Sequence, residues 1–421
     1  GAKIGQGARI SIEAEIAEYD LVNIGKDAAI EYANVRPFGV DKGCIILGPV
    51  SVGDRASVGV RSVVAPFTAV PNDTHLSPLT SSYVVDRNSD EKHAHYNRRT
   101  LPEPSLLMQT FVGRPITFLV AAISHIPALL IVVWMVSYAW DNKDRFRTMS
   151  DLMEWLCDAR RIPFYIGIRI ARATVAPFVY MAGAILVKWA VIGRFEAGPR
   201  DKTSEWELLR HWLAMKLFSR ENIQNVTELL GRHYELVSVL YRLLGAKVGK
   251  RVFWPGHQPI TTGEFDLLTI GDDVVFGSRS ALFFTTANSC ERISLCAGSN
   301  VSDNSVVLPG SILGKNAVLG SNSLCPEGWY LPEGSVWLGC HGGEPMMLER
   351  GVEADLGGHM IASEMRTEQL VMEGDNSTLR PFGKAFYLGQ ATYRVLPLSF
   401  IIAFTFFAKV LIACVHSFPL L

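Results

Sequence analysis

Aliphatic residues recur every six positions in two widely separated stretches of the chain. The two series are Ile46, Val52, Val58, Val64, Val70, and Val301, Val307, Leu313, Leu319, Cys325, Leu331, Trp337. A six-residue period fits neither an α-helix nor a single strand, but it fits a β-helix in which three short strands form each coil. The pattern predicts that each aliphatic residue points into a triangular prism and that the Gly or small residue after it turns the corner.

The two stretches are imperfect copies of one another. Residues 1–5 return as residues 245–249, and residues 18–27 return as residues 264–273. The sequence therefore predicts a mainly β protein with two left-handed parallel β-helix (hexapeptide-repeat) domains, at residues 1–85 and 245–345. The left-handed sense departs from the usual right-handed crossover, so this prediction depends on the repeat alone.

Three apolar blocks interrupt this pattern, at Pro115–Tyr138, Ala173–Ile192 and Val395–Leu421. Each is long enough to cross a bilayer core of about 30 Å as a helix. Lys188 lies near the end of the second block, where a long side chain can snorkel to the membrane surface. Lys409 lies in the middle of the third and needs a partner, such as a carboxylate on a helix outside this chain, unless it marks a route for a polar product.

The blocks divide the chain into a predicted series of segments. They are a linker (86–113), a transmembrane helix (114–139), a loop with an interfacial helix (140–172), a transmembrane helix (173–193), amphipathic and capping helices (194–244), a second linker (346–391) and a third transmembrane helix (392–421). For residues 204–217, two interpretations remain open, a helix at the membrane surface and a helix packed on its own domain.

Two spans between the repeat domains form a hairpin, which predicts that both domains face one compartment. Lys and Arg flank the two sides of the hairpin in equal number, so the positive-inside rule does not choose that compartment. Seven cysteines without a CxxC pair indicate reduced thiols and favour the cytosol. The formal net charge of −1 argues against a nucleic-acid partner. The chain lacks an initiator Met and stops inside an apolar run, which is typical of a piece of a longer polypeptide.

A pair of carboxylates is the strongest chemical signal. Glu264 and Asp266 lie two residues apart, so on an extended strand they point the same way, and Glu18 and Asp20 repeat the arrangement. Two carboxylates on one face can raise one pKa and provide a base, or they can bind an ammonium group. The alternative is a solvated coil edge that serves folding only.

Histidine supplies a second candidate, because hexapeptide-repeat proteins are commonly acyltransferases that use a His as general base. His257, in a turn just before Glu264, is the best placed, although a lone loop His is more often simply solvated. No three His residues occur at metal-ligand spacing, and the sequence predicts no metal site.

One family matches the second copy closely in two stretches, residues 240–249 with 264–273, and residues 305–310 with 335–339. The chain resembles the membrane-embedded C-terminal region of single-module nonribosomal peptide synthetases of the ε-poly-L-lysine synthetase type. In that family, adenylation and carrier domains precede transmembrane helices interleaved with tandem acyltransferase-like domains. Thr286 stands where the resemblance implies a His, so the second copy is either a degenerate partner, or Glu264 or His257 has taken over.

The resemblance implies amide-bond formation from an aminoacyl thioester on the phosphopantetheine arm of a carrier domain, with catalytic candidates Glu264, Asp266, His257, Thr286, Glu18 and Asp20. The implied partners are a lipid bilayer, the adenylation and carrier domains of the same polypeptide and an aminoacyl substrate, and a homo-oligomer is compatible. Two rivals stay open. One is a membrane-associated O- or N-acyltransferase that uses free acyl-CoA, and the other is a non-catalytic scaffold.

Overall fold

The computed structural model describes residues 1–11, 14–84, 103–141, 148–199, 204–256, 258–285, 289–341, 344–349 and 397–415. They belong to two compact units. The coil unit comprises Gly1–Pro102, Glu196–Thr203 and Leu267–Asp375, and the helical unit comprises Glu103–Phe195, Ser204–Asp266 and Asn376–Leu421.

In the first repeat stretch, short parallel strands form three ladders, β1-β4-β9-β12, β2-β5-β10-β13 and β3-β6-β11. The strands are β1 (Lys3–Ile4), β2 (Arg9–Ile10), β3 (Glu15–Ile16), β4 (Val22–Ile24), β5 (Ala29–Ile30), β6 (Asn34–Val35), β9 (Val50–Val52), β10 (Ser57–Val58), β11 (Val63–Val64), β12 (Ala69–Val70) and β13 (His75–Leu76). Ser57 pairs with His75 and Ser51 with Ala69, in each case 18 residues on. Three strands at six-residue spacing therefore complete one coil.

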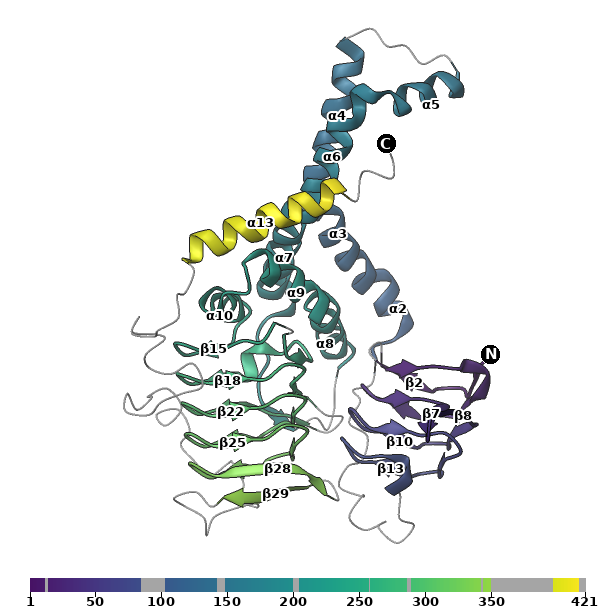
Figure 1. The fold of residues 1–421 in the computed structure, drawn as a ribbon, viewed down its shortest axis with the longest axis vertical. Helices are drawn as coiled ribbons and strands as arrows, with labels where there is room; N and C mark the ends of the chain where they lie inside the picture. Colours follow the sequence, from purple (N-terminus) through teal and green to yellow (C-terminus); the bar gives the residue numbers. More distant parts are fainter. Residues whose placement is uncertain are drawn as a thin grey trace. The chain divides into compact units, whose positions relative to one another are not determined.

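The second repeat stretch is built in the same way, with ladders β17-β21-β24-β27, β18-β22-β25-β28-β29 and β19-β23-β26. The strands are β17 (Leu268–Ile270), β18 (Val275–Phe276), β19 (Ala281–Leu282), β21 (Ile293–Leu295), β22 (Asn300–Val301), β23 (Val306–Val307), β24 (Ile312–Leu313), β25 (Val318–Leu319), β26 (Leu324–Cys325), β27 (Tyr330–Leu331), β28 (Val336–His341) and β29 (Glu344–Glu349). Figure 1 shows these coils as stacked rows that end at β29, which pairs antiparallel with β28.

Parallel ladders at this spacing fit the predicted β-helix, and the left-handed sense of the coil stays a prediction. Both stacks belong to the coil unit, where the rings of Tyr32 and Phe283 lie 5.4 Å apart, so a division into two separate domains also stays a prediction. The aliphatic series lies inside as expected. Val58, Val64, Val307 and Leu319 have no exposed surface.

The corners of the coils differ from the sequence prediction. The backbone turns with a positive φ at Arg55, Arg61, Phe67, Asp73 and Leu79, the third residue after each aliphatic one, and none of these is glycine. The expectation that the Gly after the aliphatic residue turns the corner is therefore wrong for this stack.

Those glycines are needed for close approach instead. A Cβ on Gly53 would lie 2.6 Å from the backbone nitrogen of Asn72, and one on Gly25 would lie 2.6 Å from that of Asp54. No side chain fits at such a distance, because real Cβ contacts are longer than 3.0 Å. The glycine thus lets the next coil stack directly above.

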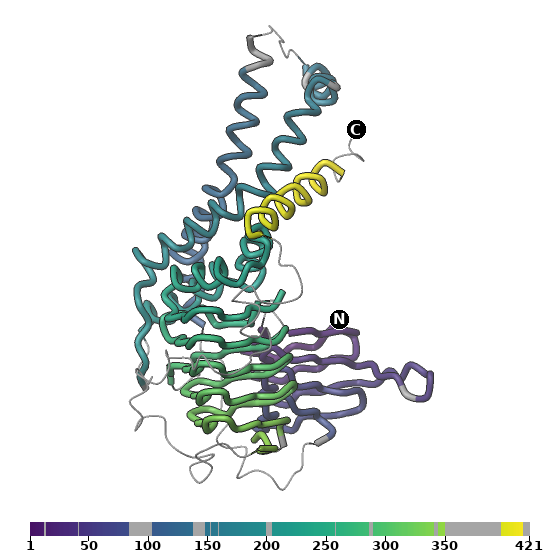
Figure 2. The backbone as a smooth tube through the Cα atoms, turned by 60° about the vertical axis from the view of Figure 1, so that its left-hand side comes forward, coloured from purple at the N-terminus to yellow at the C-terminus, as the bar shows by residue number. Residues whose placement is uncertain are grey.

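Two antiparallel strands leave the first stack. β7 (Phe38–Asp41) pairs with β8 (Cys44–Leu47), and Figure 2 shows this hairpin projecting sideways from the coils. A further pair joins β14 (Gly198–Pro199) to β20 (Ser289–Cys290). Three 3-10 turns complete the elements built from strands and turns, namely η1 (Tyr19–Leu21), η2 (Ser82–Val84) and η8 (Phe265–Leu267).

Most of the helical unit consists of two long antiparallel helices, which Figure 2 shows side by side. The first contains α2 (Leu106–Met108), the π-helical η4 (Gln109–Gly113), α3 (Arg114–Ser124) and α4 (Ile126–Asp141); the second contains α6 (Ile162–Ile170), the π-helical η6 (Ala171–Val175), α7 (Ala176–Val187) and the π-helical η7 (Lys188–Ile192). The other elements are α5 (Met149–Cys157), η5 (Ala159–Arg161), α8 (Glu205–Leu217), α9 (Arg220–Leu229), α10 (Tyr234–Leu243), β15 (Lys247–Val248), β16 (Ile260–Thr261) and α13 (Leu398–Val415).

Three helices are long and apolar enough to cross a membrane, at Leu106–Ser124, Ile162–Ile192 and Leu398–Val415. Their apolar side chains face outward, as those of Phe118 and Phe404 do at 73% and 60% exposure. The second helix begins at Ile162, whereas the sequence prediction started it at Ala173 and placed residues before that in a loop and an interfacial helix. Pro163 lies in the first turn, where proline is tolerated, so it starts this helix rather than breaking it.

The first coil of the second repeat belongs to the helical unit and packs against α10. The ring of Tyr241 is fully buried and stacks on Trp254, with ring centroids 4.2 Å apart. Trp254 Nε1 donates to Ser238 Oγ at 2.9 Å, and Arg242 Nε donates to the carbonyl of Val248 at 2.9 Å. The helix that leads into the repeat therefore covers its first coil, which satisfies polar groups that an open coil end would leave exposed.

For α8, the structure supports packing within the unit rather than a helix lying at a membrane surface. Leu209, Leu213 and Leu217 have no exposed surface, and a Cβ on Gly263 of the first coil would touch the backbone of Ala214 at 2.9 Å. Both sides of this helix are therefore covered.

Lys409 has a partner inside this chain. Its Nζ lies 2.8 Å from Glu228 Oε2 of α9, so the sequence was right that this lysine needs a pair, and no helix outside the chain is required. Burial opposes the ionisation of Glu228, but hydrogen bonds from Lys409, Gln224 and Arg232 outweigh it and lower the pKa of Glu228 to about 2.

We expect this pair to make stability fall at low pH. The pKa of Glu228 is lowered on folding, so its contribution is fully present above the ordinary value of 4.5 and is lost as the pH falls toward about 2. The melting temperature of the detergent-solubilised chain should drop over this range, and the drop should be smaller in Glu228→Gln than in the control Glu221→Gln on the same helix. A gap between the two variants that is constant with pH would contradict this.

Candidate functional site

The two Glu-x-Asp motifs form 3-10 turns, not strands. Tyr19–Leu21 and Phe265–Leu267 adopt this turn at equivalent places in the two copies. The prediction that each pair of carboxylates shares one face of an extended strand is therefore wrong, because the two-residue period applies only to strands.

In the second copy, Asp266 binds an ammonium group that belongs to the protein. Its Oδ2 lies 2.5 Å from Nζ of Lys188, and it also accepts from the backbone N–H of Phe195 at 3.2 Å. Lys188 has no exposed surface, and its Nζ additionally donates to the carbonyl of Gly193 at 2.5 Å. The sequence prediction that Lys188 snorkels to the membrane surface is therefore wrong, because it turns inward at the π-helical end of the second long helix.

Glu264 is paired as well. Its Oε1 lies 2.5 Å from His211 Nδ1 of α8, and both residues are buried, with 0% and 2% exposure. The ring of His211 packs on Phe195 with centroids 4.5 Å apart, and Phe195 also lies 5.1 Å from Lys188 Nζ. The two ion pairs thus surround one aromatic ring and form one cluster, which we call the buried ionic cluster (Lys188, Phe195, His211, Glu264, Asp266).

A carboxylate that orients an imidazole is the arrangement used by many general bases. Here the pair lies away from solvent, and a base must reach the proton that it removes. The cluster joins the second long helix, α8 and the first coil, so its geometry favours a structural connection. Glu264 Oε2 is buried and has no hydrogen-bond partner among the described residues, so the connection is not fully satisfied.

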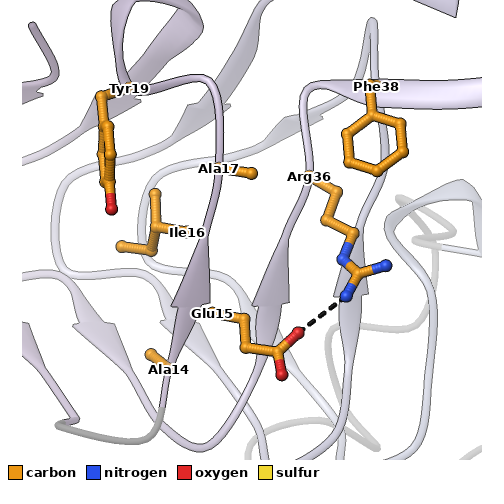
Figure 3. Close-up of a pocket in the computed structure, with 7 residues that line it drawn as sticks. All are labelled: Ala14, Glu15, Ile16, Ala17, Tyr19, Arg36 and Phe38. Carbon is orange, nitrogen blue, oxygen red and sulfur yellow. Dashed lines mark hydrogen bonds and ion pairs between the residues drawn. The ribbon is translucent and has the colours of Figure 1, made fainter. Parts of the chain in front are cut away.

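In the first copy, the same motif lies beside an open groove. The groove has a volume of about 530 Å³ and is lined by Ala14, Glu15, Ile16, Ala17, Tyr19, Arg36 and Phe38. Figure 3 shows Tyr19 and Phe38 on opposite sides of the Ile16–Ala17 segment, with Glu15 reaching toward Arg36. The volume lies within the range of small-molecule pockets.

The charges of this groove are accessible. Glu15 Oε2 and Arg36 Nη2 lie 2.7 Å apart, and their side chains are 65% and 46% exposed. Asp20 is exposed, whereas Glu18 Oε2 is buried and has no hydrogen-bond partner in the described part of the chain. The arrangement offers carboxylates to a cation and a guanidinium to an anion, next to a floor of small apolar side chains.

Of the six candidate residues, the structure places Glu264 and Asp266 in the buried ionic cluster and Glu18 and Asp20 beside the groove. His257 and Thr286 lie outside the described residues. Sequence reasoning missed His211, Glu15 and Arg36. His211 was detectable only as a polar residue on the apolar face of α8, which by itself does not identify a partner.

Cysteine chemistry is disfavoured inside the second stack. Burial raises the pKa of the Cys325 thiol to about 12 and that of Cys296 to about 11, so neither forms a thiolate readily near neutral pH. Among the described residues, no three His, Cys, Asp or Glu side chains converge as metal ligands would.

Comparison with known proteins gives one distant relative in sequence. The chain is 23% identical over 363 residues to the Delta-poly-L-ornithine synthetase of Acinetobacter baumannii (strain AB307-0294), and the match covers 80% of this chain and 25% of that protein. The chain thus spans about a quarter of the relative's length. No family model matches. Among solved structures, a serine acetyltransferase from Neisseria gonorrhoeae covers 61% of this chain at 13% identity, with a TM-score of only 0.19. The sequence relative fits the predicted kind of protein, a poly-amino-acid synthetase-like chain.

The buried ionic cluster yields a prediction about stability. Asp266→Ala leaves the Lys188 charge buried without its partner, and we expect a loss of about 3–5 kcal/mol in the free energy of unfolding. The double variant Lys188→Met/Asp266→Leu removes both charges and should recover most of that loss. Denaturant unfolding in detergent measures both.

The matched control is Glu15→Ala, which breaks an exposed pair and should cost about 1 kcal/mol or less. The structural interpretation fails if Asp266→Ala costs no more than Glu15→Ala, or if the double variant is as unstable as the single one.

Proposed function

We propose that the chain is the membrane-anchored, acyltransferase-like region of a nonribosomal-peptide-synthetase-like enzyme that joins amino acids through amide bonds. The observation that carries the proposal is the similarity to the poly-ornithine synthetase, because it extends over four fifths of the chain. A general acyltransferase or amide-forming activity agrees with that relative. The carrier-bound mechanism set out below is the finer part of the proposal.

The reaction is aminolysis of a thioester. The amine nitrogen of one amino acid attacks the carbonyl carbon of an aminoacyl group held on a phosphopantetheine thiol; the C–N bond forms and the C–S bond breaks. The amine loses a proton to a base and the departing thiolate gains one. Adenylation with ATP, in a domain outside this chain, supplies the energy of the thioester. The contribution of this chain is to hold the arm and the amine together, which makes the step effectively intramolecular.

The groove of the first copy is the proposed place for the arm. It is open, its floor of Ala14, Ile16 and Ala17 suits the thin aliphatic parts of pantetheine, and Arg36 offers hydrogen bonds to its amides. The equivalent motif of the second copy is occupied by Lys188 and His211. This contrast supports the first copy as the working one and the second as its degenerate partner.

The carboxylates beside the groove suit an amine substrate. Glu15 is exposed and can attract the ammonium form by its charge. Glu18 carries a buried carboxylate oxygen without a partner among the described residues, and such a group can accept the proton that the amine loses. We assign Glu15 to binding and Glu18 to proton transfer.

Membrane anchoring is proposed on the three apolar helices, with the coil unit in the cytosol, where ATP and reduced thiols are available. The buried ionic cluster then holds the end of the second span to the first coil of the second repeat.

The proposal predicts that the full-length enzyme, given ATP and its amino acid, accumulates an amide-linked product. Liquid chromatography with mass spectrometry should detect adenylate, carrier-bound thioester and amide in that order. Formation of the first two without the third, in active preparations, would refute the amide-forming role. Turnover of free acyl-CoA by this chain alone would favour the acyl-CoA-dependent rival.

Filling the groove should stop the reaction at the thioester. In Ala17→Trp, the indole occupies the space proposed for the arm, and we expect kcat/KM for the carrier-bound thioester to fall about 100-fold, while adenylation and loading are unchanged. The matched control is Ala69→Trp, an exposed alanine on the same stack outside the groove. Equal amide formation by both variants would remove the groove from the mechanism, and unchanged product in Glu18→Gln as well would favour the scaffold rival.

A further inference from the structure

The helical unit contains a second groove, which the proposed chemistry does not use. Its volume is about 620 Å³, and its lining includes Arg114, Phe118 and Ala121 of α3, Tyr180 of α7, and Trp212 and Lys216 of α8. It therefore lies where two long apolar helices meet α8.

Two cations in this groove lack acidic partners. The side chains of Arg114 and Lys216 are exposed and form no ion pair or hydrogen bond with the residues that the structure describes. Lys216 Nζ lies 5.8 Å from the centroid of the Trp212 ring, which fixes it near the groove without neutralising it. Glu103 also lines the groove, but its carboxylate accepts a hydrogen bond from Gln109 Nε2 at 3.1 Å. The charged groups of the lining thus sum to a net positive charge.

A neutral donor adds to this charge. The Tyr180 hydroxyl accepts from Asn222 Nδ2 at 3.1 Å, so its own O–H points elsewhere and can donate. Asn222 Nδ2 is in turn held by the carbonyl of Leu217 at 3.2 Å. A guanidinium, an ammonium and a phenol O–H together suit the oxygens of a phosphate.

The position of the groove along the helix decides between kinds of phosphate. Arg114 is the last charged residue before an apolar run that continues to Ser137. Beyond it, Phe118 and Leu119 are 73% and 58% exposed, so an apolar helix surface leads away from the cations. A charged end followed by an apolar surface matches an amphiphile rather than a soluble phosphate.

We propose that this groove binds one anionic phospholipid, with its phosphate on Arg114 and Lys216 and an acyl chain along the exposed side of α3. The site is independent of the proposed amide-forming reaction, because no residue of the first-copy groove contributes to it. A bound lipid would fix the depth of the helices at the membrane surface where the positive charges end.

The test uses the whole chain in detergent, titrated with a phosphatidylglycerol and observed by native mass spectrometry. We expect one lipid to remain bound at low lipid concentration. The variant Arg114→Gln/Lys216→Gln should weaken this binding about thirty-fold, because each basic group near a lipid phosphate adds about a factor of five. The matched control is Lys3→Gln/Arg9→Gln, which removes an exposed Lys and Arg from the coil unit.

Two other probes complete the design. Phosphatidylcholine, which carries no net charge, should bind at least ten-fold more weakly than phosphatidylglycerol, and soluble phosphopantetheine should not displace the lipid. Equal binding of the two lipids, displacement by phosphopantetheine, or a control variant as weak as the groove variant would each overturn the assignment. A melting temperature within a few degrees of wild type for both variants, measured in parallel, confirms that folding is intact.

Discussion

Direct stacking of one coil on the next is the constraint on which the coil unit depends. Each coil closes in 18 residues, so parallel strands pair with partners one coil away, as Ser57 does with His75. Stacking at this distance leaves no room for side chains where backbones meet, which explains Gly25 and Gly53. The interior accepts only small or aliphatic groups, and a buried Ser such as Ser305 is tolerated because its hydroxyl donates to the carbonyl of Gly320, 2.6 Å away in the next coil.

The duplicated Glu-x-Asp turn shows how one backbone element serves two purposes. In the second copy, long side chains from α7 and α8 reach the turn, and the resulting pairs exclude solvent. In the first copy, the turn borders the groove lined by Tyr19, and its carboxylates stay available. The local sequence is nearly the same, so the difference comes from which helices the chain delivers to the turn.

The sequence could predict the periodic features and not the pairings. The hexad series identified the buried positions, such as Val307, because every sixth residue must face inward whatever the surroundings. Apolar length located the candidate spans, although the second begins earlier than predicted because Pro163 sits in a first turn. The partners of Lys188 and Lys409 lie 78 and 181 residues away, at Asp266 and Glu228, and no local pattern encodes such distances. The turn geometry of Glu264 was missed for a related reason, since a strand period was assumed where the coil changes direction.

Charges at the ends of the apolar helices have two different fates, and burial decides between them. Lys188 has no exposed surface, so the cost of removing it from water is offset only by its close contacts with Asp266 and the carbonyl of Gly193. Arg114 stays exposed and does not need a protein partner. A buried pair of this kind fixes where a helix ends relative to the coil that follows, whereas an exposed cation remains free to meet an external anion. The helical unit therefore combines fixed internal connections with an accessible positive edge, as a region that must hold its position at a membrane surface requires.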